Sequence, residues 1–154
     1  SASVADQQID YVFYESDDGI TYTETTSLTY TMRQPGDIKY YRVEVTNPDT
    51  SDYNVNVYLS GLADVNSDGT PYVGPASLTE VVALSASVDG SLTVDDTLDQ
   101  LVAGSIVSVS NAFVLLGGQT KTVDFSLTIL GTADNTYQNL GIEVDEIKIY
   151  FDTQ

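Results

Sequence analysis

The sequence contains no histidine and no cysteine, and both absences exclude chemistry. A HExxH zinc site, a Ser-His-Asp triad and a Cys-His pair each need an imidazole or a thiol, so this chain can form none of them. Disulfide bonds are excluded as well, and a secreted chain of this kind would depend on its core or its assembly for stability. We expect no enzymatic activity.

Basic residues are scarce, with 5 Lys and Arg against 23 Asp and Glu, and the net charge is -18. Binding to phosphate depends on clustered Lys and Arg, so we expect neither nucleic acid nor an anionic membrane surface as a partner. The acidic surface could serve solubility in salty or acidic surroundings, or the binding of divalent cations, and both interpretations stay open. No apolar run approaches the length of a membrane span.

The residues that are present favour β-structure. A chain of 154 residues is long enough to bury one ordinary core. Threonine, valine, tyrosine and isoleucine are abundant, and short alternating segments follow one another with turns between them. The sequence therefore predicts an all-β fold, a β-sandwich of the jelly-roll type with one short helix.

Most of the predicted elements come from alternation or from turn residues. Apolar residues alternate most cleanly in residues 38–46 and 53–59, which predicts one buried and one solvent-facing side in each strand. We predict a helix over residues 94–102, with Asp95 or Asp96 as its cap. Gly117-Gly118 predicts a tight hairpin between strands 106–116 and 122–130. The other predicted strands are residues 20–25, 28–32 and 78–88, and residues 61–77 are expected to form a loop.

The last strand has one irregularity. From Leu140 onward apolar residues recur at every second position, but the pattern slips by one residue at Asp145-Glu146. A β-bulge would absorb such a slip.

The N-terminal residues form a separate pattern. Residues 1–8 are small and polar, and Ile9, Tyr11 and Phe13 then alternate up to a turn at Asp17-Asp18-Gly19. We expect residues 1–19 to be an N-terminal extension and residues 20–154 to be a single β-sandwich domain. The start Ser1-Ala2-Ser3 is typical of a mature terminus left after cleavage, although an artificial start would look the same, and we expect an extracellular, cell-surface location.

Two motifs carry a resemblance to a known family. Gln34-Pro35-Gly36-Asp37 precedes a long strand and a turn at Asn47, and Asn135-Thr136-Tyr137-Gln138 precedes the strand that runs to Gln154. In this combination the chain resembles the TasA/camelysin family of secreted fibre-forming surface proteins and similar archaeal filaments. Camelysin-like proteins are sometimes described as metallopeptidases, but that activity does not transfer, because the histidine ligands are missing.

The resemblance implies a homopolymer filament built by donor-strand exchange, in which the N-terminal strand of one subunit completes the sheet of the next. Its function would be in biofilm matrix, adhesion or cell connection. The residues expected to carry the exchange are Ile9, Tyr11, Val12, Phe13 and Tyr14. The residues alone favour the alternative, in which this segment is the first strand of its own sheet.

One segment has the spacing of a calcium loop. Asp64, Asn66 and Asp68 occupy its first, third and fifth positions, Gly69 follows, and Thr70 could offer its carbonyl. Position twelve is Pro75 rather than glutamate, so the segment is not an EF-hand. Calcium is a possible ligand, and a metal-free turn is the alternative.

Tyrosine supports a second functional hypothesis. The chain has 11 tyrosines and no tryptophan. Tyrosines on a strand surface could stack on sugars, which would make this a secreted carbohydrate-binding or adhesin β-sandwich module that binds surface glycans or matrix components. Tyrosines at strand spacing more often pack in the core or line a subunit interface.

Overall fold

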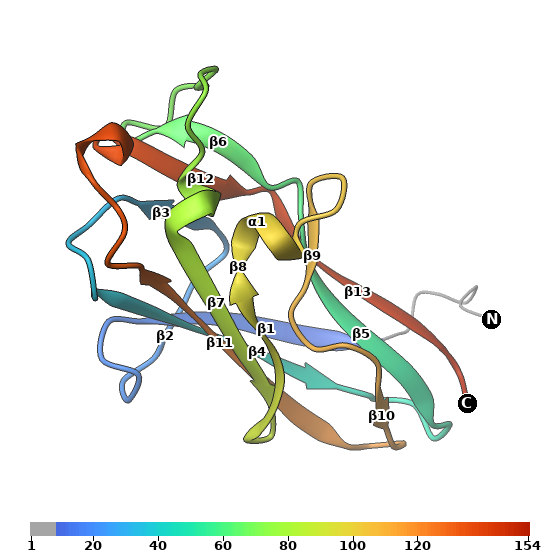
Figure 1. The fold of residues 1–154 in the computed structure, drawn as a ribbon. Coiled ribbons are helices and arrows are strands. Elements are labelled where there is room, and N and C mark those ends of the chain that lie inside the picture. The colour runs from blue at the N-terminus through green and yellow to red at the C-terminus, as the bar shows by residue number, and fades with distance from the viewer. Residues whose placement is uncertain (1–8) are drawn as a thin grey trace.

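The computed structural model describes residues 9–154, which fold as a two-layered β-sandwich (Figure 1). The first layer is one sheet with the strand order β2-β1-β4-β11-β7-β8. Its strands are β1 (Asp10–Ser16), β2 (Thr23–Glu24), β4 (Ile38–Thr46), β7 (Val82–Val88), β8 (Ser91–Thr97) and β11 (Thr120–Ile129). All pairs in this sheet are antiparallel.

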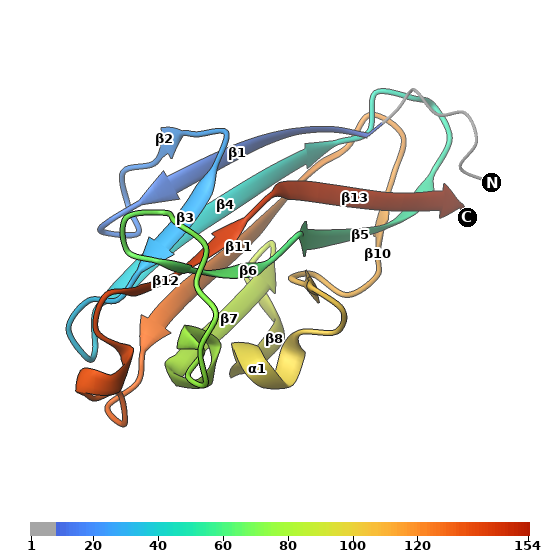
Figure 2. The same cartoon turned by 90° about the horizontal axis from the view of Figure 1, so that it is seen from above.

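The second layer consists of two smaller sheets. One has the order β10-β5-β13, with β9 also paired to β5, and the other has the order β3-β12-β6. Their strands are β3 (Leu28–Thr31), β5 (Tyr53–Ser60), β6 (Ala63–Asn66), β9 (Ile106–Ser108), β10 (Phe113–Leu115), β12 (Leu140–Val144) and β13 (Glu146–Thr153). Figure 2 shows that β12 runs on into β13, which links the two sheets. The structure is the expected all-β sandwich.

The core lies between the layers and follows the predicted alternation. In β4 the buried residues are Tyr41, Val43 and Val45, while the residues between them are partly exposed. In β5 every second residue from Val55 to Leu59 is buried in the same way. Both strands therefore turn the predicted apolar face inward, as half-buried antiparallel strands do.

The irregularity in the last strand is confirmed. β12 ends at Val144 and β13 begins at Glu146, so Asp145 stands between them. Its amide donates to the carbonyl of Ser60 at 3.0 Å. Gly61 has a φ of +72° and lies against Asp145, where a Cβ would come within 2.5 Å of the Asp145 side chain. The break at Asp145 and the close approach of Gly61 lie where the chain changes its strand partners, from β3 and β6 to β5.

The helix predicted over residues 94–102 is wrong in its first half. Residues 91–97 form β8, and only α1 (Leu98–Leu101) is helical, with Thr97 rather than Asp95 or Asp96 at its N-cap. Val94 pairs with Ala86 of β7 and is buried, and that burial holds the segment in the sheet. Residues 78–88 also differ from the prediction, because they begin with a 3₁₀ turn, η2 (Leu78–Val81), before β7.

The hairpin predicted around Gly117-Gly118 does not form. β10 pairs with β5 in the second layer, and β11 pairs with β4 and β7 in the first. The connection therefore crosses between layers. Gly117 lies on the backbone of Thr50, where a Cβ would be 2.4 Å from the Thr50 carbonyl oxygen, so glycine is needed for this close approach.

The first strand belongs to the same sandwich as the rest of the chain. All seven residues of β1 pair with β4, so the sheet continues across the domain boundary expected at residue 19. Of the expected extension, residues 1–8 lie outside the described residues. Within residues 9–154, no helix is long and apolar enough to cross a membrane.

Candidate functional site

The candidate site is β1 with its surroundings. Tyr11, Val12, Phe13 and Tyr14 lie within β1, and Ile9 comes just before it and packs against the core. The strand has one long neighbour, β4, with a register running from Asp10 opposite Thr46 to Ser16 opposite Tyr40. Its other neighbour, β2, covers only two residues. β1 is therefore held mainly from one side.

Phe13 anchors the strand in the core. Its side chain is only 5% exposed, and its ring stacks on Tyr41 with the centroids 5.8 Å apart and on Phe125 with the centroids 6.4 Å apart. Tyr41 and Phe125 stack on each other at 5.0 Å. Tyr11, by contrast, is 44% exposed. Of the predicted donor residues, Phe13 is thus the one that fills a deep position.

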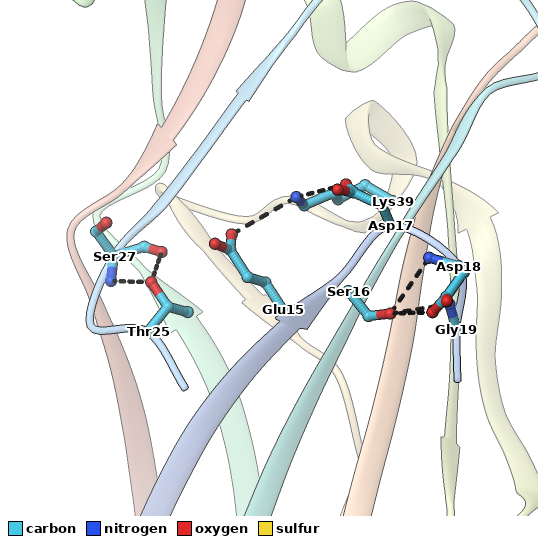
Figure 3. Close-up of polar contacts among 8 residues, drawn as sticks. All are labelled: Glu15, Ser16, Asp17, Asp18, Gly19, Thr25, Ser27 and Lys39. Carbon is cyan, nitrogen blue, oxygen red and sulfur yellow. Dashed lines mark hydrogen bonds and ion pairs between the residues drawn. The ribbon is translucent and has the colours of Figure 1, made fainter. Parts of the chain in front are cut away.

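Lys39 fixes the end of β1 to β4, as Figure 3 shows. Its ammonium lies 2.9 Å from the Asp17 carboxylate and 3.7 Å from that of Glu15. The hydrogen bond from Lys39 lowers the pKa of Asp17, because it stabilises the charged carboxylate. Both contacts lie at the surface, so each contributes little to stability.

The turn that leaves β1 is held by its own hydrogen bonds (Figure 3). The Asp18 carboxylate accepts bonds from the amides of Ile20 and Thr21, both at 2.8 Å, and from the Ser16 hydroxyl at 3.0 Å. These bonds lower the pKa of Asp18, those from the Thr21 and Ile20 amides most. Gly19 has a φ of +74°, which glycine adopts without strain.

A groove opens between β1 and the second layer. Its volume is about 280 Å³. It is lined by Tyr11, Val12, Phe13, Glu24, Thr25, Thr26, Leu28, Val144, Glu146 and Ile147. Thr25 is one of the lining residues, and the Thr25 amide donates to the carbonyl of Phe13 at 2.9 Å. Thr25 is itself held by Ser27, whose amide and carbonyl bond its hydroxyl (Figure 3).

The expected calcium residues divide into two groups. Asp64 accepts a hydrogen bond from the Ser77 hydroxyl at 2.7 Å. Asn66 donates to the Thr70 hydroxyl at 3.0 Å, and the Thr70 hydroxyl donates to Asp68 at 2.6 Å, which lowers the pKa of Asp68. Within the described residues, no three acidic side chains lie close enough together to hold a metal ion. Calcium binding stays a prediction.

Two tyrosines of the second layer, the partly buried Tyr58 and the exposed Tyr150, contact each other. Tyr58 and Tyr150 meet edge to face, with centroids 5.1 Å apart and an angle of 81° between the rings. Asn56 donates to the Tyr58 hydroxyl at 2.9 Å. Rings at right angles do not make one flat surface for stacking on a sugar, so this pair adds no support for the glycan-binding hypothesis, which stays untested.

Sequence reasoning missed the partners of the anchor. The alternation placed Tyr41 on the buried face of its strand, but nothing in it linked Tyr41 to Phe13 or Phe125, which lie far away in the sequence. Lys39 is one of only five basic residues in an acidic chain, and this scarcity was a signal that it could pair with nearby acids.

Comparisons with known proteins add no family. No protein-family model matches the chain, and no curated protein matches it. Among solved structures, the GH31 alpha-xylosidase from Xanthomonas citri aligns with 93% of this chain at 11% identity and a TM-score of 0.35. The chain covers 16% of that protein's length. A likeness this weak carries no argument about function.

Proposed function

We propose that this chain is a structural, non-catalytic subunit of an extracellular filament, and that its subunits polymerise head-to-tail by donor-strand exchange. The observation that carries the proposal is the way β1 is held. It has one deep anchor, Phe13, one long partner, β4, and a single turn that joins it to β2.

The interactions needed for strand exchange are already present within the single chain. In the single chain β1 completes its own sheet, with Val12 opposite Glu44 and Phe13 opposite Val43. A second copy carries the same β1, and its strand could make the same ladder and place its Phe13 against Tyr41 and Phe125. The turn at residues 17–21 would then act as the hinge. The free-energy cost of such an exchange is small, because β1 would pair with the next subunit through the same hydrogen bonds and side-chain contacts that it makes within its own chain.

Strand exchange of this type builds an open polymer. The donor and acceptor surfaces are different parts of the subunit, so each added copy leaves one free β1 and one free acceptor at the two ends. A subunit that has lost its β1 presents an unpaired edge of β4, which an incoming strand can cover. Filaments of this kind would serve in biofilm matrix, adhesion or cell connection.

The first test is imaging. Negative-stain images of the full-length chain are compared with those of a variant lacking residues 1–15, each in the presence of calcium. We expect filaments from the full-length chain and a folded β-rich monomer from the variant. If neither sample forms filaments, β1 serves only its own sheet, and the glycan-binding module becomes the leading hypothesis.

A second test asks whether β1 pairs between chains. The natural chain has no cysteine, so introduced thiols have no competitors. Val12→Cys and Glu44→Cys are made in separate chains and mixed under assembly conditions; directly opposite positions suit a disulfide. We expect cross-linked pairs after oxidation. Val12→Cys mixed with Glu143→Cys, an exposed position on β12, is the matched control and should stay uncross-linked.

A further inference from the structure

The free edge of β13 is a second surface that strand exchange does not use. Within residues 9–154, β13 pairs with β5 along its whole length and has no strand on its other side. Figure 2 shows β13 along one side of the sandwich, with β5 beside it. β3 occupies the equivalent position next to β12, where Leu28 lies opposite Val144. Among residues 9–154, a vacant strand position therefore begins beyond Leu28, the first residue of β3, and runs the length of β13.

The backbone of β13 is set up to accept a strand there. The Gln154 amide donates to the Asp52 carbonyl, on the β5 side. Amides alternate in direction along an antiparallel strand, so those of residues 147, 149, 151 and 153 point away from β5. Of these four amides, that of Thr153 donates to the Asp152 carboxylate at 2.9 Å, and among residues 9–154 no backbone hydrogen bond from another strand reaches the outer edge at the other three positions. An edge of this length, left open, is a template for pairing with another strand.

The side chains of β13 also alternate. Ile147 is buried and Ile149 and Phe151 are partly buried, so these three face the core. Lys148 and Tyr150 are exposed on the outer face, together with Glu146 and Asp152. Any strand that adds to this edge would need apolar residues toward the core and charges that complement Lys148 and Asp152 on the outside.

We propose that the occupant is β13 of a second copy, which pairs antiparallel with β13 about a two-fold axis at Tyr150. In this register Lys148 lies opposite Asp152 of the second copy, and the reciprocal pair repeats the contact. Ile149 lies opposite Phe151 of the second copy on the core side. In this register the outward N–H groups of Ile149 and Phe151 face the carbonyls of Phe151 and Ile149 in the second copy, so these ladder bonds form without a change of fold.

Charge selects this register over its neighbours. A shift of two residues one way places Glu146 opposite Asp152 of the second copy, which sets two like charges against each other. The opposite shift places Lys148 opposite Gln154, and the ion pair is lost. Opposite charges across a strand pair are favourable and like charges are unfavourable, so the register centred on Tyr150 is preferred.

The contact joins two sandwiches side by side and does not depend on strand exchange. It forms between self-completed single chains as well as between subunits of a filament, where it would link neighbouring filaments in opposite directions. A head-to-tail polymer grows beyond two copies and needs β1, whereas the β13 pair stops at two copies.

The experiment measures the mass of the soluble, unassembled full-length chain by sedimentation equilibrium, in about 0.15 M salt, where charges are screened beyond ~8 Å. We expect a reversible monomer–dimer equilibrium. Lys148→Glu turns both ion pairs into repulsions and should weaken the dimer about tenfold or more. The combined change Lys148→Asp with Asp152→Lys swaps the charges and should restore it. Lys121→Glu on β11 makes the same net charge change away from this edge, so it should weaken the dimer only by general repulsion and much less than Lys148→Glu.

Amide hydrogen exchange gives a second readout that does not rely on charge. The amides of Ile149 and Phe151 should become protected as the protein concentration rises through the dimer range. A chain that stays monomeric at all concentrations, or equal effects of Lys148→Glu and Lys121→Glu, would overturn the proposal. So would a dimer that appears only after removal of residues 1–8, because the chain's own N-terminal segment would then be the occupant of this edge.

Discussion

Phe13 is the residue on which the position of β1 depends most. Its ring is buried against Tyr41 and Phe125. Removing a buried phenylalanine ring costs about 3 to 5 kcal/mol, so we expect Phe13→Ala to lower the free energy of unfolding by that amount, measured by urea denaturation. Tyr11→Ala is the matched control on the same strand, and because Tyr11 is half exposed its cost should be below about 1 kcal/mol. Equal costs would mean that Phe13 is not the anchor.

Tyr30 of β3 carries an unsatisfied hydroxyl. Its ring is 1% exposed, and its Oη has no hydrogen-bond partner within residues 9–154. A buried polar atom without a partner is destabilising, so Tyr30→Phe should raise the free energy of unfolding by about 1 kcal/mol at neutral pH. A lower stability of Tyr30→Phe would show that the hydroxyl is satisfied in solution, for example by a bound water molecule.

The same hydroxyl predicts a loss of stability in alkali. Burial raises the pKa of Tyr30 to about 12, above the usual value of 10.0. A raised pKa gives stability that is complete below the usual value and is lost as the pH rises through the folded value. We expect Tyr30→Phe to lose less stability than the natural chain between about pH 10 and pH 12. Urea denaturation across this range measures the difference, and equal losses would contradict it. Tyr41, whose pKa burial also raises, contributes in the same direction in both proteins.

At the scale of elements, the turn after β1 responds to acid. The pKa values of Asp17 and Asp18 lie below the usual 3.8, because Lys39 and backbone amides stabilise the charged forms. A lowered pKa gives stability that is present above the usual value and is lost as the pH falls through the folded value. Below about pH 4, β1 should therefore loosen, seen as faster amide exchange in residues 10–16.

The variant Asp18→Asn tests this cause. The asparagine side chain keeps an acceptor oxygen for the amides of Ile20 and Thr21 but does not titrate in this range. Its β1 amides should exchange at a rate that depends less on pH than in the natural chain. An unchanged pH dependence would place the acid sensitivity elsewhere in the molecule.

The loop at residues 64–70 gives the calcium prediction. We expect millimolar calcium to raise the Tm by about 2 to 4 °C, as oxygen ligands of Asp64 and Asp68 gather around the ion. Asp68→Asn should abolish the shift. Asp49→Asn, in another turn held by its own carboxylate, should keep it. Magnesium at the same concentration is the control for general charge screening. Equal shifts in Tm with calcium and with magnesium would contradict specific calcium binding at this loop.

Local pattern predicted the elements whose stability comes from a buried face. Residues 38–46 form β4 as predicted, because alternating apolar residues can all be buried together only when the segment is a strand with one face on the core. Residues 94–97 contain acids and a threonine typical of a helix start, yet they form part of β8. Here the burial of Val94 against the neighbouring sheet outweighs local preference.

Strand partners were beyond the reach of local pattern. Gly117-Gly118 has the composition of a hairpin turn, but a turn does not specify which strands meet on either side of it. For the same reason, only part of the candidate site could be predicted. The segment from Ile9 to Tyr14 was identified, whereas its register on β4 and its stack on Tyr41 and Phe125 depend on residues far away in the chain.

At the scale of the whole molecule, we expect net charge to oppose the proposed assembly. The net charge is -18. Four of the five basic residues contact groups of their own chain: Lys39 contacts Asp17, Arg42 contacts Asp124, Lys121 lies over the Phe113 ring and Arg33 lies over the Tyr30 ring. Copies of such a chain repel one another, and this repulsion opposes both strand exchange and side-by-side pairing.

Salt should therefore promote filament growth. Raising sodium chloride from about 0.01 M to about 1 M shortens the screening length from ~30 Å to ~3 Å, which removes most repulsion between subunits but leaves the buried contacts of Phe13 intact. We expect faster growth and longer filaments across this range, measured by light scattering and checked by imaging. The variant lacking residues 1–15 should scatter no more light at any salt concentration, because screening cannot replace the missing strand. Growth that slows as salt rises would mean that ion pairs between subunits, rather than burial of β1, dominate the assembly.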